Sequence, residues 1–196
     1  VLARRFKKKK DSSDSEEIKI HNWLRNFTRG RKPAYEHVLS GRGIDNLFKY
    51  HVNKYIQEKN PENIAGYLKR CEEAEDKSAF IGQQAAQGNT HEIFQDTMKF
   101  FWKTYGRATH DLVVHENARG GVWIAGGIIR KDYAGGNDQY KEKVKDWFMT
   151  EFTSGPTHRS WVNKTPLHVI TDKRAGLEGC IEVGSNPEYF ERERQN

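Results

Sequence analysis

The sequence predicts an α/β protein that is rich in helices and has a short, mostly parallel sheet. Apolar residues recur every three to four positions through much of the chain, which is typical of amphipathic helices. Val122–Ala125 and Leu167–Ile170 are instead short apolar runs of strand-forming residues, and helical segments alternate with them. This alternation favours parallel strands connected by helices. The 10 Phe, 8 Tyr and 5 Trp residues exclude a disordered chain.

Most of the chain before Gly120 is expected to form helices. Ser13 and Glu16 have the S-x-x-E spacing of a capping box, in which side chains bind the free N–H groups of a first turn. Asn60-Pro61 can open a helix too, because Asn caps and Pro is tolerated at the first helical position. The widest apolar face belongs to a long helix before Gly120, which predicts burial on more than one side. The stripes that predict these helices lie within Ile20–Phe27, Ile44–Tyr55, Ser78–Gln87 and Ile93–Leu112.

The second half is expected to contain both strands of the sheet. Val122–Ala125 ends at two glycines, Gly126 and Gly127, and both apolar runs read as buried parallel strands. A helix with an apolar side from Tyr140 to Phe152 separates the strands. A short final helix begins near Gly176, and the residues after Gly184 form a polar tail.

The formal charge of +6 raises the possibility of an anionic partner. The only dense basic run, Arg4–Lys10, is followed at once by acidic residues, so nucleic-acid binding is the weaker hypothesis and a surface loop the stronger one. No apolar run approaches the about 20 residues of a membrane span, and no signal peptide is evident. We therefore expect a cytoplasmic protein that binds neither nucleic acid nor membrane. Cys71 and Cys180 are expected to be buried, reduced thiols.

Two glycine-containing segments are candidate binding sites. Gly126 and Gly127 bring bare backbone to the carboxyl edge of the predicted sheet, where α/β proteins bind ligands, although a plain strand-to-loop turn is equally compatible. Ser40-Gly41 opens a helix whose N-terminus favours polar or anionic groups, although an ordinary cap explains it as well. Glu36, just upstream, could accept hydrogen bonds from hydroxyl groups or simply be solvated. No phosphate-loop, dinucleotide, nucleophile or metal-ligand spacing is present, so no metal site is expected.

Taken in order, several segments resemble the bacterial-type glucokinase family, whose members have the actin-like, ribonuclease H-like ATPase fold. The most specific match is to the family's G-G-V-x-I-A-G-G-I strand. The matching segments are Glu36–Ile44, Phe100–Arg107, Gly120–Ile128, Pro166–Ile170 and Ala175–Gly179. The resemblance implies that residues 1–184 form the C-terminal large domain of that fold and that residues 185–196 are the polar tail.

The resemblance also implies a function: transfer of the γ-phosphoryl group of ATP to the 6-hydroxyl of glucose, the first step of glycolysis, assisted by Mg²⁺. Glu36 would bind glucose hydroxyls, and Gly126 and Gly127 would lie against the adenosine of ATP. Ser40 and Gly41 would border the nucleotide cleft. A homodimer is expected from the family alone. The alternatives are a related sugar kinase and a non-catalytic, sugar-binding regulator of the same fold.

Several motifs of the resembled family do not occur in this chain. The D-x-G-G-T phosphate loop, the N-D pair with the catalytic aspartate and the G-x-G-G-H sugar motif are missing. We therefore expect no catalytic residue in this chain, which would begin just after the G-G-H segment. The chain also departs from the family at Arg42, Arg130-Lys131 and Ala175, where proline is frequent, and these departures fall in predicted loops.

Overall fold

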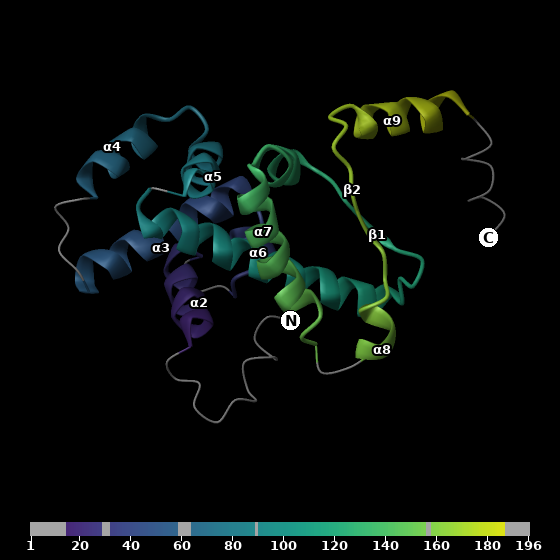
Figure 1. Ribbon diagram of the computed structural model, residues 1–196, viewed down its shortest axis with the longest axis horizontal. Helices are drawn as coiled ribbons and strands as arrows, with labels where there is room; N and C mark the ends of the chain where they lie inside the picture. Colours follow the sequence, from purple (N-terminus) through teal and green to yellow (C-terminus); the bar gives the residue numbers. More distant parts are fainter. Residues whose placement is uncertain (1–14, 29–31, 59–63, 89, 156–157, 187–196) are drawn as a thin grey trace.

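The computed structural model describes residues 15–28, 32–58, 64–88, 90–155 and 158–186 (Figure 1). The basic run Arg4–Lys10, the proposed cap at Ser13 and the expected helix opening at Asn60-Pro61 lie outside these ranges. No helix within them is long and apolar enough to cross a membrane.

The body of the protein is a group of helices around one long helix, α6 (Figure 1). Helix α6 packs against α3, α5 and α7, while α2 packs on α3 and α4 packs on α5. The predicted burial of α6 on more than one side is therefore confirmed. The helices of this body are α2 (Glu16–Phe27), α3 (Gly41–Glu58), α4 (Ala65–Glu73), α5 (Lys77–Gln87), α6 (Glu92–Glu116) and α7 (Asp138–Phe152).

Aromatic side chains fill the centre of this body. Trp102, Phe94 and Phe101 of α6 and Phe152 of α7 are each almost wholly removed from water. Burying side chains of this kind contributes about 1.5–3 kcal/mol each, before the opposing loss of conformational entropy. The apolar stripes therefore place most of the core, because helical periodicity indicates which side chains face inward. Phe27 and Leu112, at the ends of two of these stripes, are exceptions and are exposed.

The ends of α6 and α7 are set by local hydrogen bonds. The side chain of Asn137 accepts a hydrogen bond from the Tyr140 backbone N–H and caps α7. Helix α6 ends at Asn117, whose φ of 51° is left-handed. Asn tolerates this conformation better than most residues, so the helix stops before the predicted Gly120.

The sheet has two parallel strands among the described residues, β1 (Val122–Ile124) and β2 (Leu167–Val169). The parallel pairing, with Trp123 opposite His168, confirms the prediction. The predicted burial is wrong: Ile124 is buried, but Trp123 is 62% exposed and Val169 is 39% exposed. The physical reason differs between the two faces: the face that carries Trp123 is exposed, and on the other face Val169, which pairs with Ile124, borders a cavity of about 200 Å³ beside α6 and α7 instead of packing closely.

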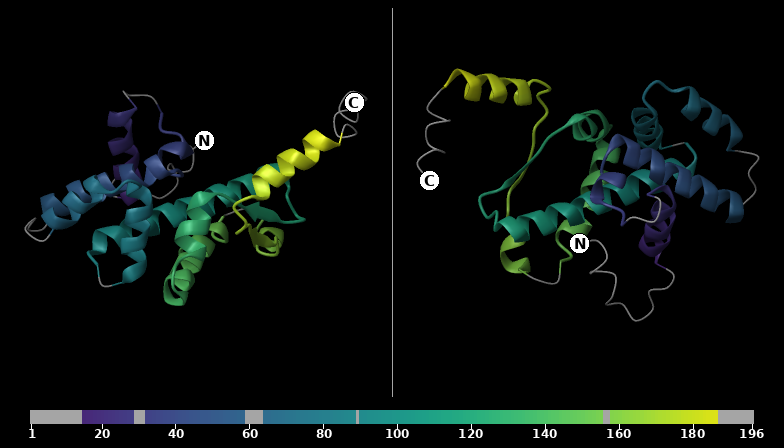
Figure 2. Two further views of the ribbon diagram at one scale, coloured as in Figure 1. Left: turned by 90° about the horizontal axis from the view of Figure 1, so that it is seen from above. Right: turned by 180° about the vertical axis from the view of Figure 1, so that it is seen from behind.

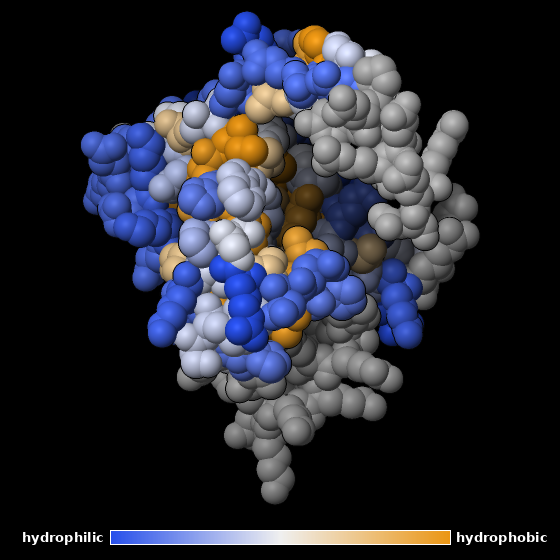
Figure 3. Space-filling view, turned by 90° about the vertical axis from the view of Figure 1, so that its right-hand side faces the viewer, coloured by the Kyte–Doolittle hydropathy of each residue, from blue (hydrophilic) through white to orange (hydrophobic). Residues whose placement is uncertain are grey.

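The last helix, α9 (Ala175–Ser185), follows β2 and lies apart from the helical body (Figures 1 and 2). The strands themselves contact the body, because Ile124 belongs to its core and Val122 and Leu167 pack against it. Helix α9 has no buried residue, and its Leu177 and Ile181 are exposed. Figure 3 shows hydrophobic residues around a hollow on this side of the molecule. Cys71 is buried as expected, whereas Cys180 is exposed, because it lies on α9, a helix without a buried residue.

Three short elements complete the structure and were not predicted. They are the 3-10 turn η2 (Tyr35–His37), the π-helix η4 (Ile129–Ala134) and helix α8 (Arg159–Val162). Two of them flank the candidate site: η2 precedes α3, and η4 follows the glycine pair.

Candidate functional site

The glycine pair forms a sharp turn between β1 and η4. Gly126 has a φ of 117°, which side chains disfavour, and its carbonyl accepts a hydrogen bond from the Arg130 N–H at 3.3 Å. A Cβ atom placed on Gly127 would meet nothing within 4 Å, so its side-chain position faces open space. The turn therefore exposes backbone where the sequence predicted it.

Gly127 borders a cavity of about 560 Å³ between α5 and η4, which we call the glycine cavity. Its walls combine apolar side chains with several polar and charged groups, which can orient a small molecule. Residues that line it include Ile44, Asp76, Ser78, Gly82, Gly127 and Asp132.

The mouth of the glycine cavity carries Asp76 and Lys131. The Asp76 carboxylate caps α5 by accepting hydrogen bonds from the Ala79 N–H at 3.0 Å and the Ser78 hydroxyl at 2.7 Å. Lys131 Nζ lies 3.2 Å from Asp76 Oδ2, and both side chains are exposed. The hydrogen bond from Ala79, followed by that from Ser78, lowers the pKa of Asp76 to about 2. The carboxylate is thus ionised and already committed to three partners.

Asp132 lines the same cavity and is less exposed than Asp76 and Lys131. Its carboxylate accepts hydrogen bonds from Trp102 Nε1 at 2.8 Å and from the Tyr140 hydroxyl at 3.0 and 3.1 Å. Burial raises the pKa of Asp132 to about 6, although both donors act in the opposite direction. A Cβ atom on Gly82 would collide with Oδ1 of this carboxylate, so glycine on α5 leaves room for it.

A second, smaller cavity of about 200 Å³ lies beside the first and is called the Leu39 slot here. Gly127 and Ile128 line both cavities, whereas Gly126 lines only the Leu39 slot. The slot has mostly apolar walls, including Leu39, Phe101 and Tyr105. The structure therefore brings both predicted glycines to a hollow region, where their turn borders two cavities.

Ser40 and Gly41 lie next to this region but line neither cavity. The Ser40 hydroxyl donates to the Glu36 carbonyl at 2.8 Å and accepts from the Gly43 N–H at 2.9 Å, so it caps α3. A Cβ atom on Gly41 would lie 3.2 Å from Oγ of Ser78. The N-termini of α3 and α5 therefore meet at the edge of the glycine cavity.

Glu36 lies in η2 and is exposed. Its carboxylate lines none of the cavities described above. The turn that carries it is anchored by the Tyr35 hydroxyl, which donates to Asp111 at 3.1 Å, and by Asn46, which donates to the His37 carbonyl at 3.2 Å. The sugar-binding role of Glu36 stays a prediction.

Asp76, Ser78 and Asp132 were not singled out in the sequence. Asp76 was overlooked because it lies in a charged segment. An Asp two residues before the predicted helix Ser78–Gln87 is nevertheless a signal for a helix cap. Asp132 has a weaker signal, an acidic residue between the pairs Gly126-Gly127 and Gly135-Gly136. Its burial could not be read from the sequence, since no helical period marks η4.

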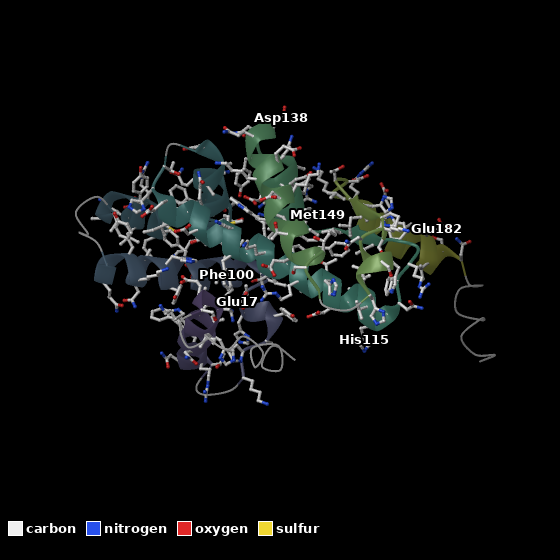
Figure 4. The ribbon with its side chains drawn as sticks, turned by 60° about the horizontal axis from the view of Figure 1, so that its bottom comes forward. Glu17, Phe100, His115, Asp138, Met149 and Glu182 are labelled. Atoms are coloured by element: carbon white, nitrogen blue, oxygen red, sulfur yellow. The ribbon has the colours of Figure 1, made fainter. Side chains whose placement is uncertain are left out.

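A separate charged groove of about 280 Å³ lies between α2, α3, α6 and α7 (Figure 4). Glu17 and Phe100, both labelled there, line this groove. Arg107 bridges Glu17 at 2.5 Å and Glu151 at 2.6 Å, and so ties three helices together. Among the described residues, no group of three His, Cys, Asp or Glu side chains is placed to hold a metal ion.

The fold around these cavities is similar to that of a solved sugar kinase. The chain superposes on the crystal structure of a glucokinase from an Antarctic psychrotroph with a TM-score of 0.57 and 21% identity. The match covers 81% of this chain and 42% of that one. A helix-rich domain with a short parallel sheet is therefore shared with that kinase.

Residues 10–186 match the family model "Glucokinase", so the chain belongs to the glucokinase family. Among curated relatives, the glucokinase of Trichormus variabilis is 25% identical over 157 residues, which is 76% of this chain and 43% of the relative. The glucokinase of Hahella chejuensis is 25% identical over 177 residues, covering 90% and 47%. The chain thus spans less than half the length of the curated relatives that it matches.

Proposed function

We propose that this chain provides the nucleotide-binding side of a glucokinase that transfers the γ-phosphoryl group of ATP to the 6-hydroxyl of glucose. The observation that carries the proposal is the position of Gly126-Gly127, the family's A-G-G turn, between two cavities in a chain that matches the family over residues 10–186. The glycine cavity would hold the adenosine. Bare backbone on one wall allows a flat base to approach closely.

The remaining parts of the reaction are proposed from the family. Glu36 would bind glucose, Ser40 and Gly41 would shape the cleft edge, and the catalytic aspartate would come from outside this chain. Residues 1–184 would correspond to the C-terminal large domain of an actin-like ATPase fold, with residues 185–196 as a tail. A homodimer located in the cytoplasm is proposed on the family resemblance alone.

Mg²⁺ would accompany the phosphates of ATP and offset their charge. The residues at the cavity mouth do not fit a metal ion held by this chain, because Asp76 is committed to Ala79, Ser78 and Lys131. The role we assign to this chain is therefore to position the nucleotide and to exclude water from it.

A nucleotide-binding measurement tests the proposed site. The Gly127→Val substitution places a side chain in open space beside the cavity, so it should weaken ATP binding at least about tenfold while leaving the melting temperature close to that of the wild type. Gly66→Val is the matched control, since a Cβ atom there also meets nothing within 4 Å and α4 lies away from the cavity lining. Equal ATP affinity in all three proteins would refute the site.

A coupled glucose-phosphorylation assay with ATP and Mg²⁺ tests the activity, on this chain and on the full-length product of its gene. Activity only in the full-length protein is expected, because the catalytic aspartate is assigned outside this chain. Activity of this chain alone would contradict that assignment. Inactivity of both, across several hexoses, would overturn the proposed reaction.

A further inference from the structure

Asp132 is a carboxylate that the proposed reaction does not use. It lines the glycine cavity and is mostly buried, and the described residues give it two hydrogen-bond donors, Trp102 Nε1 and the Tyr140 hydroxyl. An ionised carboxylate can accept about four hydrogen bonds. Asp132 therefore keeps acceptor capacity toward the cavity, and it presents no donor when ionised.

The surroundings of Asp132 hold it in one orientation. Trp102 comes from α6, Tyr140 from α7 and Gly82 from α5, so three helices fix its position. Gly82 is required for this arrangement, since any side chain there would collide with Oδ1 and cover the carboxylate. A side chain that is already held in one orientation loses little conformational entropy when a ligand binds, which favours a role in ligand recognition.

The depth of the cavity indicates which part of a nucleotide would meet Asp132. The charged pair Asp76 and Lys131 is exposed at the mouth, whereas Asp132 is mostly buried, in a cavity whose lining also includes Ile44 and Met98. A triphosphate stays near the mouth and solvent, so the base enters first. The edge of the base would then face the buried acceptor.

We propose that Asp132 sets the base preference of the glycine cavity by accepting a hydrogen bond from the 6-amino group of adenine, with Trp102 and Tyr140 as the positioning residues. This inference rests on the proposed nucleotide site and adds a specificity-determining residue to it. Such an acceptor discriminates against a base that lacks the amino group, because the acceptor capacity that Trp102 and Tyr140 leave on the carboxylate would then face the base without a donor.

The test compares ATP with purine riboside triphosphate, which has hydrogen in place of the 6-amino group. Dissociation constants are measured by calorimetry at pH 7.5 for the wild type, Asp132→Asn and Asp138→Asn. Asp138 is the matched control, because it lies on α7, is fully exposed and lines none of the cavities described (Figure 4). The wild type and Asp138→Asn should bind ATP about tenfold more tightly than the analogue, whereas Asp132→Asn should lose this preference.

Two outcomes would overturn the proposal while leaving the nucleotide site intact. One is an unchanged preference in Asp132→Asn. The other is an Asp132-dependent loss of affinity for 2′-deoxy-ATP instead of the analogue, which would assign the carboxylate to the ribose. Failure of the wild type to bind any nucleotide would refute the proposed function as well.

A measurement without any substitution guards against a variant that does not fold. The wild-type ratio of the two affinities should fall as the pH drops through about 6, because the carboxyl of Asp132 is then protonated. Trp102, Tyr140 and Gly82 pack on it and carry no charge near this pH. Asp76, which pairs with Lys131 at the mouth, stays ionised there because its pKa is about 2. The triphosphate is common to both nucleotides and cancels in the ratio. A ratio that is constant from pH 5 to pH 8 would refute the proposal.

Discussion

Replacing Asp132 by Asn should change how stability depends on pH. In the folded protein the pKa of Asp132 is raised to about 6 by burial, compared with the ordinary value of 3.8. Below pH 3.8 the carboxyl is protonated in both states, and the folded form has its full stability. As the pH rises through 6, the folded protein must ionise a buried group, and that contribution is lost. Asn does not ionise, so the variant does not lose this stability as the pH rises.

The magnitude follows from the shift of the pKa. A difference of about 2 units corresponds to about 3 kcal/mol, at about 1.4 kcal/mol for each unit. Relative to the wild type, Asp132→Asn should therefore gain about 3 kcal/mol of unfolding free energy between pH 4 and pH 7.5. Asp76 does not interfere, because its stabilising contribution changes only as the pH falls from 3.8 to about 2 and is the same in both proteins.

Urea denaturation followed by Trp fluorescence at several pH values measures this difference, with Asp138→Asn as the exposed control. The difference between variant and wild type should rise with pH only for the substitution at Asp132. A flat difference would mean that the hydrogen bonds from Trp102 and Tyr140 balance the desolvation. A difference of opposite sign would mean that they outweigh it, and either result would refute the reasoning.

Three further outcomes are expected. Ser40→Ala should lower the unfolding free energy by about 1 kcal/mol in urea denaturation, because the cap of α3 is lost; no change would contradict that role. Gly43→Ala should cost more, about 3 kcal/mol, since a Cβ atom would collide with the Val38 carbonyl, and a smaller cost than at Ser40 would be inconsistent with this contact. A thiol reagent should modify Cys180 rapidly in the folded protein and Cys71 only after unfolding; rapid modification of both would show that α4 is open.

The helices could be predicted from the sequence because apolar residues recur at helical spacing in each of them and mark the face that is buried. The stripe from Ile93 to Leu112 placed α6, and the side chains at Phe94, Phe101 and Trp102 became the centre of the core. The pairing of the strands followed from their alternation with helices. The burial of the strands could not be predicted in the same way, because an apolar run does not show which other elements pack on each face of a strand.

Only part of the candidate site could be predicted from the sequence. Gly126 and Gly127 were found because glycines at the end of an apolar run need a structural reason, and the φ of Gly126 supplies one. Asp132 was missed because its importance arises from three-dimensional neighbours on α5, α6 and α7. A carboxylate in a helical segment gives no sign of burial when its two donors lie 30 residues upstream and 8 residues downstream.

The turn around Ser40 shows how one segment can serve both the fold and a site. Its hydroxyl donates to the Glu36 carbonyl and accepts from Gly43, so both of its hydrogen-bonding functions are used by the turn. Its one O–H donor is therefore not available to a ligand in this arrangement. The same turn carries Leu39 into the wall of the slot beside Gly126. Ser40 is therefore expected to influence nucleotide binding through the position of Leu39, not through direct contact.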